Sequence, residues 1–161
     1  MKVIHDVVCR CVKLGVLIIM CSVSLTAAAA QGVIVKNAWA RATAPGQSTA
    51  SIYLEIVSDV DAALVGAASP RARSAGIHAT RSEAGVMKMR AVPKLALPAQ
   101  KSVKLAPGGL HIMLVGIDRP LGDNERVPVE LTIEIAGGAS SIVRVEAEVR
   151  TSAGVAPPHG H

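Results

Sequence analysis

The side chains in this sequence that are best suited to chemistry are histidines and methionines. His111 and Met113 lie two residues apart in an apolar stretch, and Met87 and Met89 have the same spacing. In a β-strand, residues two apart project from the same face of the sheet, so imidazole and thioether groups could converge from separate strands. Thioethers are soft donors that Cu(I) accepts and that Zn²⁺, Ca²⁺ and Mg²⁺ do not favour. The pattern therefore indicates a site for reduced copper.

Each of these residues also has an ordinary structural interpretation. His78, near the start of an expected strand, could be a partly exposed polar side chain, and Met87 and Met89 could be packing residues. Past residue 30, however, only three methionines occur, and each is a candidate ligand or lies two residues from one. A methionine that only fills the core has no reason to be confined in this way. Taken together, the residues favour a metal site.

The first 30 residues have the pattern of a secretory signal peptide. Basic residues precede a compact apolar stretch at 14–25, and small residues lead up to Ala30. The stretch is shorter than the ~20 residues that a membrane span needs. We therefore expect cleavage after Ala30, export, and no stable insertion in the membrane. The alternatives are an uncleaved anchor and a lipoprotein attached through Cys21, although the residues before Cys21 are larger than those that precede a lipidated cysteine.

Composition excludes several classes of function. The cysteines Cys9, Cys11 and Cys21 all lie in the expected signal peptide. The remaining chain therefore has no thiol for catalysis, an Fe–S cluster, a thiolate zinc site or a blue-copper electron-transfer site. It contains no G-x-S-x-G, H-E-x-x-H, P-loop or G-x-G-x-x-G motif, so we expect a non-enzyme. Basic residues outnumber acidic ones by 17 to 12, but Trp39 and Tyr53 are the only aromatic residues, which argues against nucleic-acid binding.

The hydrophobic pattern predicts an all-β domain. From Val33 onward apolar residues alternate with polar ones and are interrupted by Gly, Pro, Asn and Asp, whereas no segment has a helical period. Gly137-Gly138 between two alternating runs predicts a hairpin. Short strands separated by turn residues are typical of a β-sandwich with an aliphatic core. The expected strands lie at about 33–40, 50–57, 63–68, 76–82, 86–92, 102–105, 110–117, 127–135 and 143–149.

The chain therefore divides into a signal peptide at 1–30, a β-sandwich domain at 31–150 and a tail at 151–161. The tail ends in Pro157-Pro158-His159-Gly160-His161. Its two imidazoles and terminal carboxylate suit Cu(II) better than Cu(I), so the tail is either a weak second copper site or an inert end.

The ligand spacing resembles that of a known family. Ten residues separate His78 from Met89, twenty-one separate Met89 from His111, and one separates His111 from Met113. This H-x10-M-x21-H-x-M pattern, together with the segments 85–90 and 107–114, is similar to the periplasmic copper chaperones of the CuA-assembly type (PCuAC). The resemblance implies a cupredoxin-like Greek-key sandwich that binds one Cu(I) through His78, Met89, His111 and Met113. Whether Met87 competes with Met89 remains open, and Met87, His159 and His161 are possible additional contacts.

The resemblance also implies partners and a location. It implies a periplasmic protein that delivers copper to the CuA centre of cytochrome c oxidase subunit II, alongside a Sco-type thiol protein. We also expect a monomer. The alternatives are a periplasmic copper-scavenging or buffering protein, and a structural β-sandwich with incidental His and Met. A basic segment could guide the chaperone to an acidic partner surface. Its members are Arg71, Arg73, Arg81, Lys88, Arg90 and Lys94, opposed only by Glu83.

Overall fold

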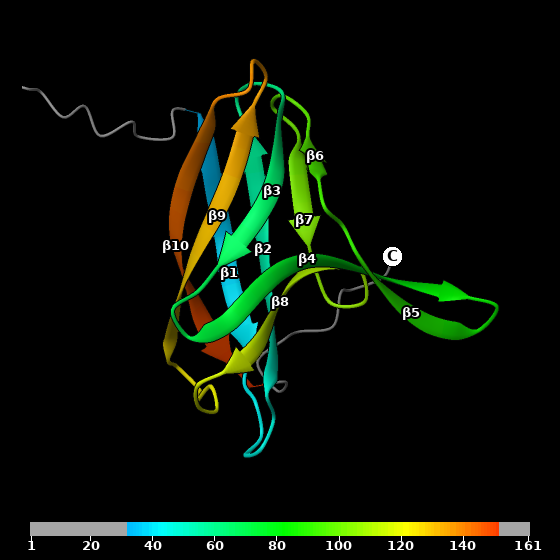
Figure 1. Ribbon diagram of the computed structural model, residues 1–161, viewed down its shortest axis with the longest axis vertical. Helices are drawn as coiled ribbons and strands as arrows, with labels where there is room; N and C mark the ends of the chain where they lie inside the picture. Colours follow the sequence, from blue (N-terminus) through cyan, green and yellow to red (C-terminus); the bar gives the residue numbers. More distant parts are fainter. Residues whose placement is uncertain (1–31, 152–161) are drawn as a thin grey trace, which may run out of the picture.

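Residues 32–151, which are those that the computed structural model describes, form only strands, turns and connecting segments. Within this range no helix could span a bilayer. The signal peptide expected at 1–30 and the tail histidines His159 and His161 lie outside the described residues. The strands are β1 Val33–Arg41, β2 Thr49–Ser58, β3 Ala62–Ala68, β4 Ala72–Glu83, β5 Val86–Ala91, β6 Leu95–Leu97, β7 Ser102–Leu105, β8 Leu110–Ile117, β9 Arg126–Ile135 and β10 Ser140–Arg150 (Figure 1).

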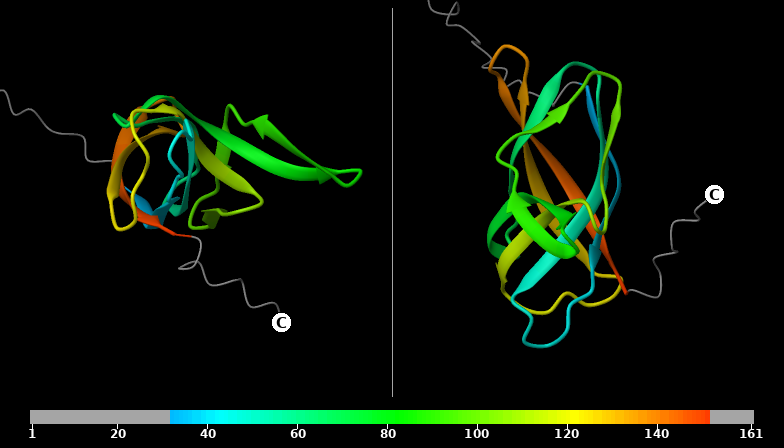
Figure 2. Two further views of the ribbon diagram at one scale, coloured as in Figure 1. Left: turned by 90° about the horizontal axis from the view of Figure 1, so that it is seen from below. Right: turned by 90° about the vertical axis from the view of Figure 1, so that its right-hand side faces the viewer.

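The strands form one sheet that closes on itself. Its order is β5-β4-β8-β2-β1-β10-β9-β3-β6, and β7 pairs with β2 beside this path. Ala67 of β3 also pairs with Ala75 of β4, which closes the ring seen end-on in Figure 2. Neighbours such as β2 and β8 are distant in sequence, and β1 pairs with β10 in parallel. These crossovers confirm the predicted all-β, Greek-key sandwich.

Alternation along the strands sorts aliphatic side chains into the core. Ile52, Leu54 and Ile56 of β2 are buried, as are Val127, Val129, Leu131 and Ile133 of β9. Each such side chain contributes roughly 1.5–3 kcal/mol through removal of its surface from water. The turn between β9 and β10 uses Gly137 and Gly138, both with positive φ (107° and 86°), as the sequence predicts.

One hairpin extends beyond the sandwich. β4 runs along the ring and then continues outward to pair with β5, so that the two strands form a projecting arm (Figures 1 and 2). Every residue of β5 is exposed. β5 is also the edge of the sheet, and only β4 pairs with it among the described strands. We call residues 80–91 the β4–β5 arm.

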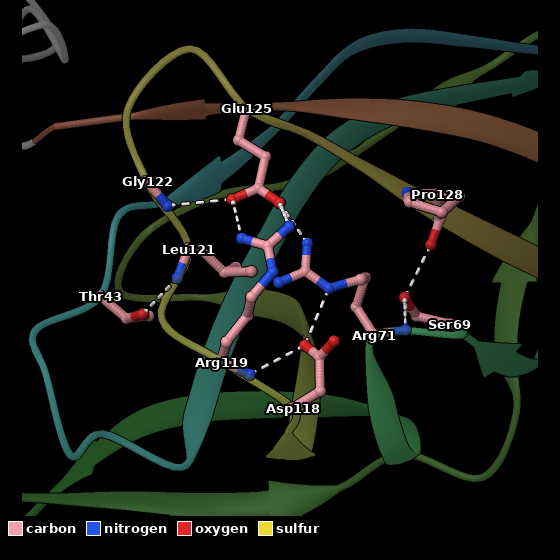
Figure 3. Close-up of polar contacts among 9 residues, drawn as sticks. All are labelled: Thr43, Ser69, Arg71, Asp118, Arg119, Leu121, Gly122, Glu125 and Pro128. Carbon is pink, nitrogen blue, oxygen red and sulfur yellow. Dashed lines mark hydrogen bonds and ion pairs between the residues drawn. The ribbon is translucent and has the colours of Figure 1, made fainter.

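The start of β4 is anchored by an ion-pair cluster (Figure 3). The side chain of Arg71 is only 12% exposed. Its Nε donates to Asp118 Oδ1 at 2.8 Å, and its Nη1 donates to Glu125. Arg119 also donates to Glu125, from Nη2 to Oε1 at 2.7 Å. The cluster therefore ties the segment between β8 and β9 to the strand that carries His78.

The same segment closes one end of the core. Leu121 is buried, and its backbone exchanges two hydrogen bonds with Thr43. The Leu121 N–H donates to Thr43 Oγ1 at 2.8 Å, and the Thr43 N–H donates to the Leu121 carbonyl at 3.1 Å. Loss of the ion-pair cluster would therefore loosen a covering segment as well as β4.

The cluster makes stability depend on pH. The hydrogen bond from Arg71 is the main reason that the pKa of Asp118 lies below its usual value. Burial alone would raise the pKa of Glu125, but hydrogen bonds from Arg119, the Gly122 N–H and Arg71 outweigh it and lower that pKa. A carboxyl whose pKa is lowered by folding stabilises the protein above its unfolded-state pKa and loses this effect as pH falls.

We predict that Arg71→Met lowers the free energy of unfolding by about 2 kcal/mol at neutral pH, because Glu125 loses a nearly buried partner. The wild type should lose stability as pH falls below about 4.5, and Arg71→Met should lose less over the same range, because fewer lowered carboxyl pKa values remain. Urea denaturation from pH 7 to pH 3 measures both effects. Arg144→Met, at an exposed ion pair with Glu130, is the matched control and should change little. Parallel pH profiles for wild type and Arg71→Met would contradict this account.

Candidate metal centre

The two sandwich histidines face each other across neighbouring strands. His78 of β4 pairs directly with His111 of β8. Their ring centroids are 6.0 Å apart, with 24° between the ring planes. The preceding and following residues, Ile77 and Ile112, pair in the same way and are buried in the core. Because side chains alternate, both imidazoles lie on the outer face of the sheet.

Met113 lies on the same face as the histidines. It follows His111 by two residues and pairs with Gly76 of β4, two residues before His78. Gly76 has no side chain, and a Cβ built there would lie 3.5 Å from Cε1 of His78. A larger side chain at Gly76 would occupy the space beside the imidazole that the Met113 thioether needs. The pairing therefore gathers two nitrogen donors and one sulfur donor on two adjacent strands.

The β4–β5 arm places Met89 nearer to His78 than Met87. Met89 pairs with Thr80 and Met87 with Ser82, so both share the face of His78. Met89 is the diagonal neighbour of His78, a position within reach of a long side chain. Met87 lies two residues farther along the arm, about 7 Å farther away at the usual strand rise. Of the two methionines of the arm, Met89 is therefore the one that lies nearer to His78.

Hydrogen bonds orient both imidazoles. His111 Nδ1 lies 3.1 Å from the Gly109 carbonyl oxygen, and His78 Nδ1 lies 3.3 Å from the Gly76 carbonyl oxygen. A carbonyl can only accept, so these contacts favour the tautomer in which each Nδ1 carries the proton and each Nε2 keeps its lone pair. The Gly109 carbonyl also accepts the Thr80 N–H at 3.1 Å, which fixes it between β4 and β8.

The Nε2 atom of His111 is the clearest indication that these residues fit a metal ion. His111 is only 4% exposed, and its Nε2 is buried without a hydrogen-bond partner. A buried polar atom without a partner costs about 1–3 kcal/mol, so such an atom needs an explanation. A metal ion bound to Nε2 supplies one. The neutral nitrogen and sulfur donors around it fit a soft monovalent cation.

The site is closed at one end and open at the other. His111 is buried, whereas Met89 is 51% exposed and Met87 is 59% exposed. Among residues 32–151, no three His, Cys, Asp or Glu side chains form a metal-binding group. The donor set therefore has no carboxylate, and an incoming molecule can reach it from the side of the arm.

The structure divides the basic segment predicted from the sequence. Arg71 belongs to the ion-pair cluster, and Lys94 pairs with Glu134 at 2.7 Å. Arg81, Lys88 and Arg90 remain together on the reverse face of the arm. They line a hollow of about 390 Å³ with Glu83, which pairs with both Lys88 (3.0 Å) and Arg90 (3.1 Å). The positive charge near the site is therefore smaller than the sequence suggests.

Sequence reasoning missed the aromatic neighbours of His111. The Tyr53 ring centroid lies 6.4 Å from that of His111, and Trp39 packs on Tyr53 at 4.5 Å. In the sequence, Tyr53 and Trp39 stand out only as rare residue types, since the chain has one Trp, one Tyr and no Phe.

Comparison with known proteins identifies the family. A family model described as "Putative lipoprotein LpqE-like" matches residues 33–149, which span β1 to β10. The chain belongs to the LpqE-like family. A relative from Leifsonia xyli subsp. xyli, "Putative lipoprotein Lxx21020", is 35% identical over 132 residues, which is 78% of each chain. Both descriptions name lipoproteins, while Cys21, the candidate lipid attachment residue of this LpqE-like chain, lies outside the described residues.

Solved structures with the same fold include a copper-bound domain and a CuI form of a second protein. The copper-bound PCuAC domain from PmoF2 has a TM-score of 0.60 and 26% identity, and the match covers 74% of this chain and 93% of that domain. Apo-DR1885 from Deinococcus radiodurans has a TM-score of 0.53 and 32% identity, covering 75% of this chain and 80% of that one. Its CuI form has a TM-score of 0.50 at the same identity, covering 78% and 84%. The LpqE-like chain therefore has the PCuAC fold that the sequence resemblance implies.

We predict that His78 and His111 of the metal-free protein, when neutral, are both Nδ1–H tautomers. The carbonyls of Gly76 and Gly109 stabilise this form by accepting the Nδ1–H. Long-range ¹H–¹⁵N NMR should give an amine-like shift for Nδ1 and an imine-like shift for Nε2 in His78 and His111. A dominant Nε2–H tautomer at His111 would contradict the assigned donor atom.

Proposed function

We propose that this protein is an extracytoplasmic, non-enzymatic Cu(I) carrier whose ligands are His78, Met89, His111 and Met113. The observation that carries the proposal is the buried, unpartnered Nε2 of His111, which lies opposite His78 and on the same face as both methionines. The copper-bound PCuAC domain and the CuI form of DR1885 support the identity of the metal, because both have this fold.

The donor chemistry favours Cu(I) over other metals. Two thioethers are poor ligands for hard divalent cations, whereas Cu(I) accepts mixed imidazole and thioether ligation. Blue-copper chemistry needs a cysteine thiolate, and none occurs in residues 32–151. Four neutral ligands also leave the +1 charge of the ion uncompensated, so a thiolate from a recipient can compete for it.

The open side favours transfer rather than storage. An incoming ligand can attack copper beside the exposed Met89 while His78 and His111 still hold the ion. We infer that the recipient is the CuA centre of cytochrome c oxidase subunit II, with a Sco-type thiol protein alongside, as the PCuAC resemblance implies. The lipoprotein descriptions of the family and of the Leifsonia relative support a location outside the cytoplasm.

We predict that Met89→Leu and Met113→Leu each weaken Cu(I) binding by at least about 10-fold, whereas Met87→Leu changes it less than about 2-fold. Leucine has nearly the same volume and apolar character, so the loss isolates the thioether. Anaerobic competition with a chromophoric Cu(I) chelator measures the affinity. Met87→Leu is the matched control because Met87 lies on the same face as Met89 and is exposed to a similar extent. Equal losses at Met87 and Met89 would show that the diagonal contact with His78 does not select the ligand.

We also predict that the charge of the arm guides the recipient. Arg81 lies directly opposite Lys88, so Arg81→Glu replaces a repulsive pair with an attractive one and should leave the arm folded. Transfer of Cu(I) to a soluble CuA domain should slow by about 3–10-fold at low salt, with the difference disappearing at high salt and the affinity unchanged.

Arg144→Glu on β10 makes the same charge change across the ring from the arm and is the control. Equal slowing by both variants would remove any special role for the arm. If wild-type protein binds Cu(I) but never transfers it to the CuA domain, the scavenging or buffering alternative replaces delivery.

A further inference from the structure

Four rings lie in one row across four adjacent strands. Trp39 of β1 pairs with Tyr53 of β2. Tyr53 follows Ile52, which pairs with Ile112, and its ring lies beside that of His111 of β8, which pairs with His78 of β4. Successive ring centroids are 4.5, 6.4 and 6.0 Å apart. The row therefore joins the aromatic residues of the chain directly to the candidate ligands.

Neither Tyr53 nor Trp39 belongs to the cluster of buried residues that forms the hydrophobic core. Tyr53 alternates with the core residues Ile52 and Leu54, so its ring lies on the outer face of β2, yet it is only 7% exposed. All other large side chains in the core are aliphatic. A chain with one Tyr, one Trp and no Phe therefore places its Tyr beside His111 and its Trp against that Tyr.

We propose that Tyr53 is a positioning residue for His111, and that Trp39 supports Tyr53. The His111 ring lies between Tyr53 on one side, at an interplanar angle of 53°, and His78 on the other. The Gly109 carbonyl fixes its Nδ1 edge. These three contacts hold the ring so that the lone pair of Nε2 stays directed to the metal position. This role rests on the proposed Cu(I) site, because the ligand that it positions is His111.

The energetic argument follows from the buried Nε2. Without Tyr53, the His111 ring could rotate about its Cβ–Cγ bond, break the hydrogen bond to Gly109 and turn Nε2 toward water. Metal binding would then have to restore the ring orientation, and that ordering cost weakens affinity. Residues that orient a metal ligand typically change affinity by 10–100-fold when they are replaced.

The test compares Tyr53→Leu, which removes the ring, with Tyr53→Phe, which keeps it. We expect Cu(I) affinity to fall by about 10–100-fold in Tyr53→Leu and to stay within about 3-fold of wild type in Tyr53→Phe. In the metal-free protein at about pH 8, the His111 ¹⁵N shifts should remain those of one tautomer in Tyr53→Phe and become averaged in Tyr53→Leu. Trp39→Leu, at a half-buried position, should change both measurements in the same direction by a smaller amount.

The control is Leu131→Ala in β9, which should lower stability without changing the His111 shifts or the affinity. Unchanged shifts and affinity in both Tyr53→Leu and Trp39→Leu would overturn the proposal, as would equal losses in Tyr53→Phe and Tyr53→Leu. If Tyr53→Leu does not fold, the Cu(I) affinities and His111 shifts of Trp39→Leu and Tyr53→Phe still test the proposal. If the wild type binds no Cu(I), the proposed function fails, while the metal-free spectra still show whether Tyr53 orients His111.

Discussion

The pairing of β4 with β8 is the constraint on which the candidate site depends. His78 faces His111 only in the register that also places Ile77 opposite Ile112. A slip of β4 by one residue would turn Ile77 to solvent and the His78 imidazole into the core, which the hydrophobic effect opposes. The core therefore sets the distance between the two imidazoles, although neither of them belongs to it. The closure of the ring at Ala67 and Ala75, together with the Arg71 cluster, holds β4 in place at its other end.

From this register the site acquires a rigid half and an accessible half. His111 is buried and held by the Gly109 carbonyl and the neighbouring rings, whereas Met89 lies on an arm that only β4 pairs with among the described strands. A carrier needs both properties. Preorganised nitrogen donors reduce the ordering cost of binding, and an exposed thioether can be displaced first when a recipient approaches. Because all four proposed donors are neutral, a recipient with a thiolate would have an electrostatic advantage over this site.

Much of the fold could be predicted from the sequence because alternation and turn residues act locally. The strands Leu110–Ile117 and Ser102–Leu105 match their predicted bounds. The strand Leu95–Leu97 was missed because it has only three residues, too few to show an alternating pattern. The candidate ligands were predictable because their spacing is part of the sequence. The contact of Tyr53 with His111 was not, since it depends on the register between two strands that are distant in the chain. The ion pairs of Arg71 could not be predicted for the same reason, because its partners Asp118 and Glu125 are 47 and 54 residues away.

The central claim is that one Cu(I) binds through two imidazoles and two thioethers at the outer face of β4, β5 and β8. X-ray absorption spectroscopy of the Cu(I)-loaded protein tests it most directly, because the extended fine structure distinguishes nitrogen from sulfur ligands and counts each. The account predicts two nitrogen and two sulfur ligands, with one sulfur lost in Met89→Leu and the count unchanged in Met87→Leu. A copper ion with no sulfur ligand, or with the same sulfur count in all three proteins, would contradict it.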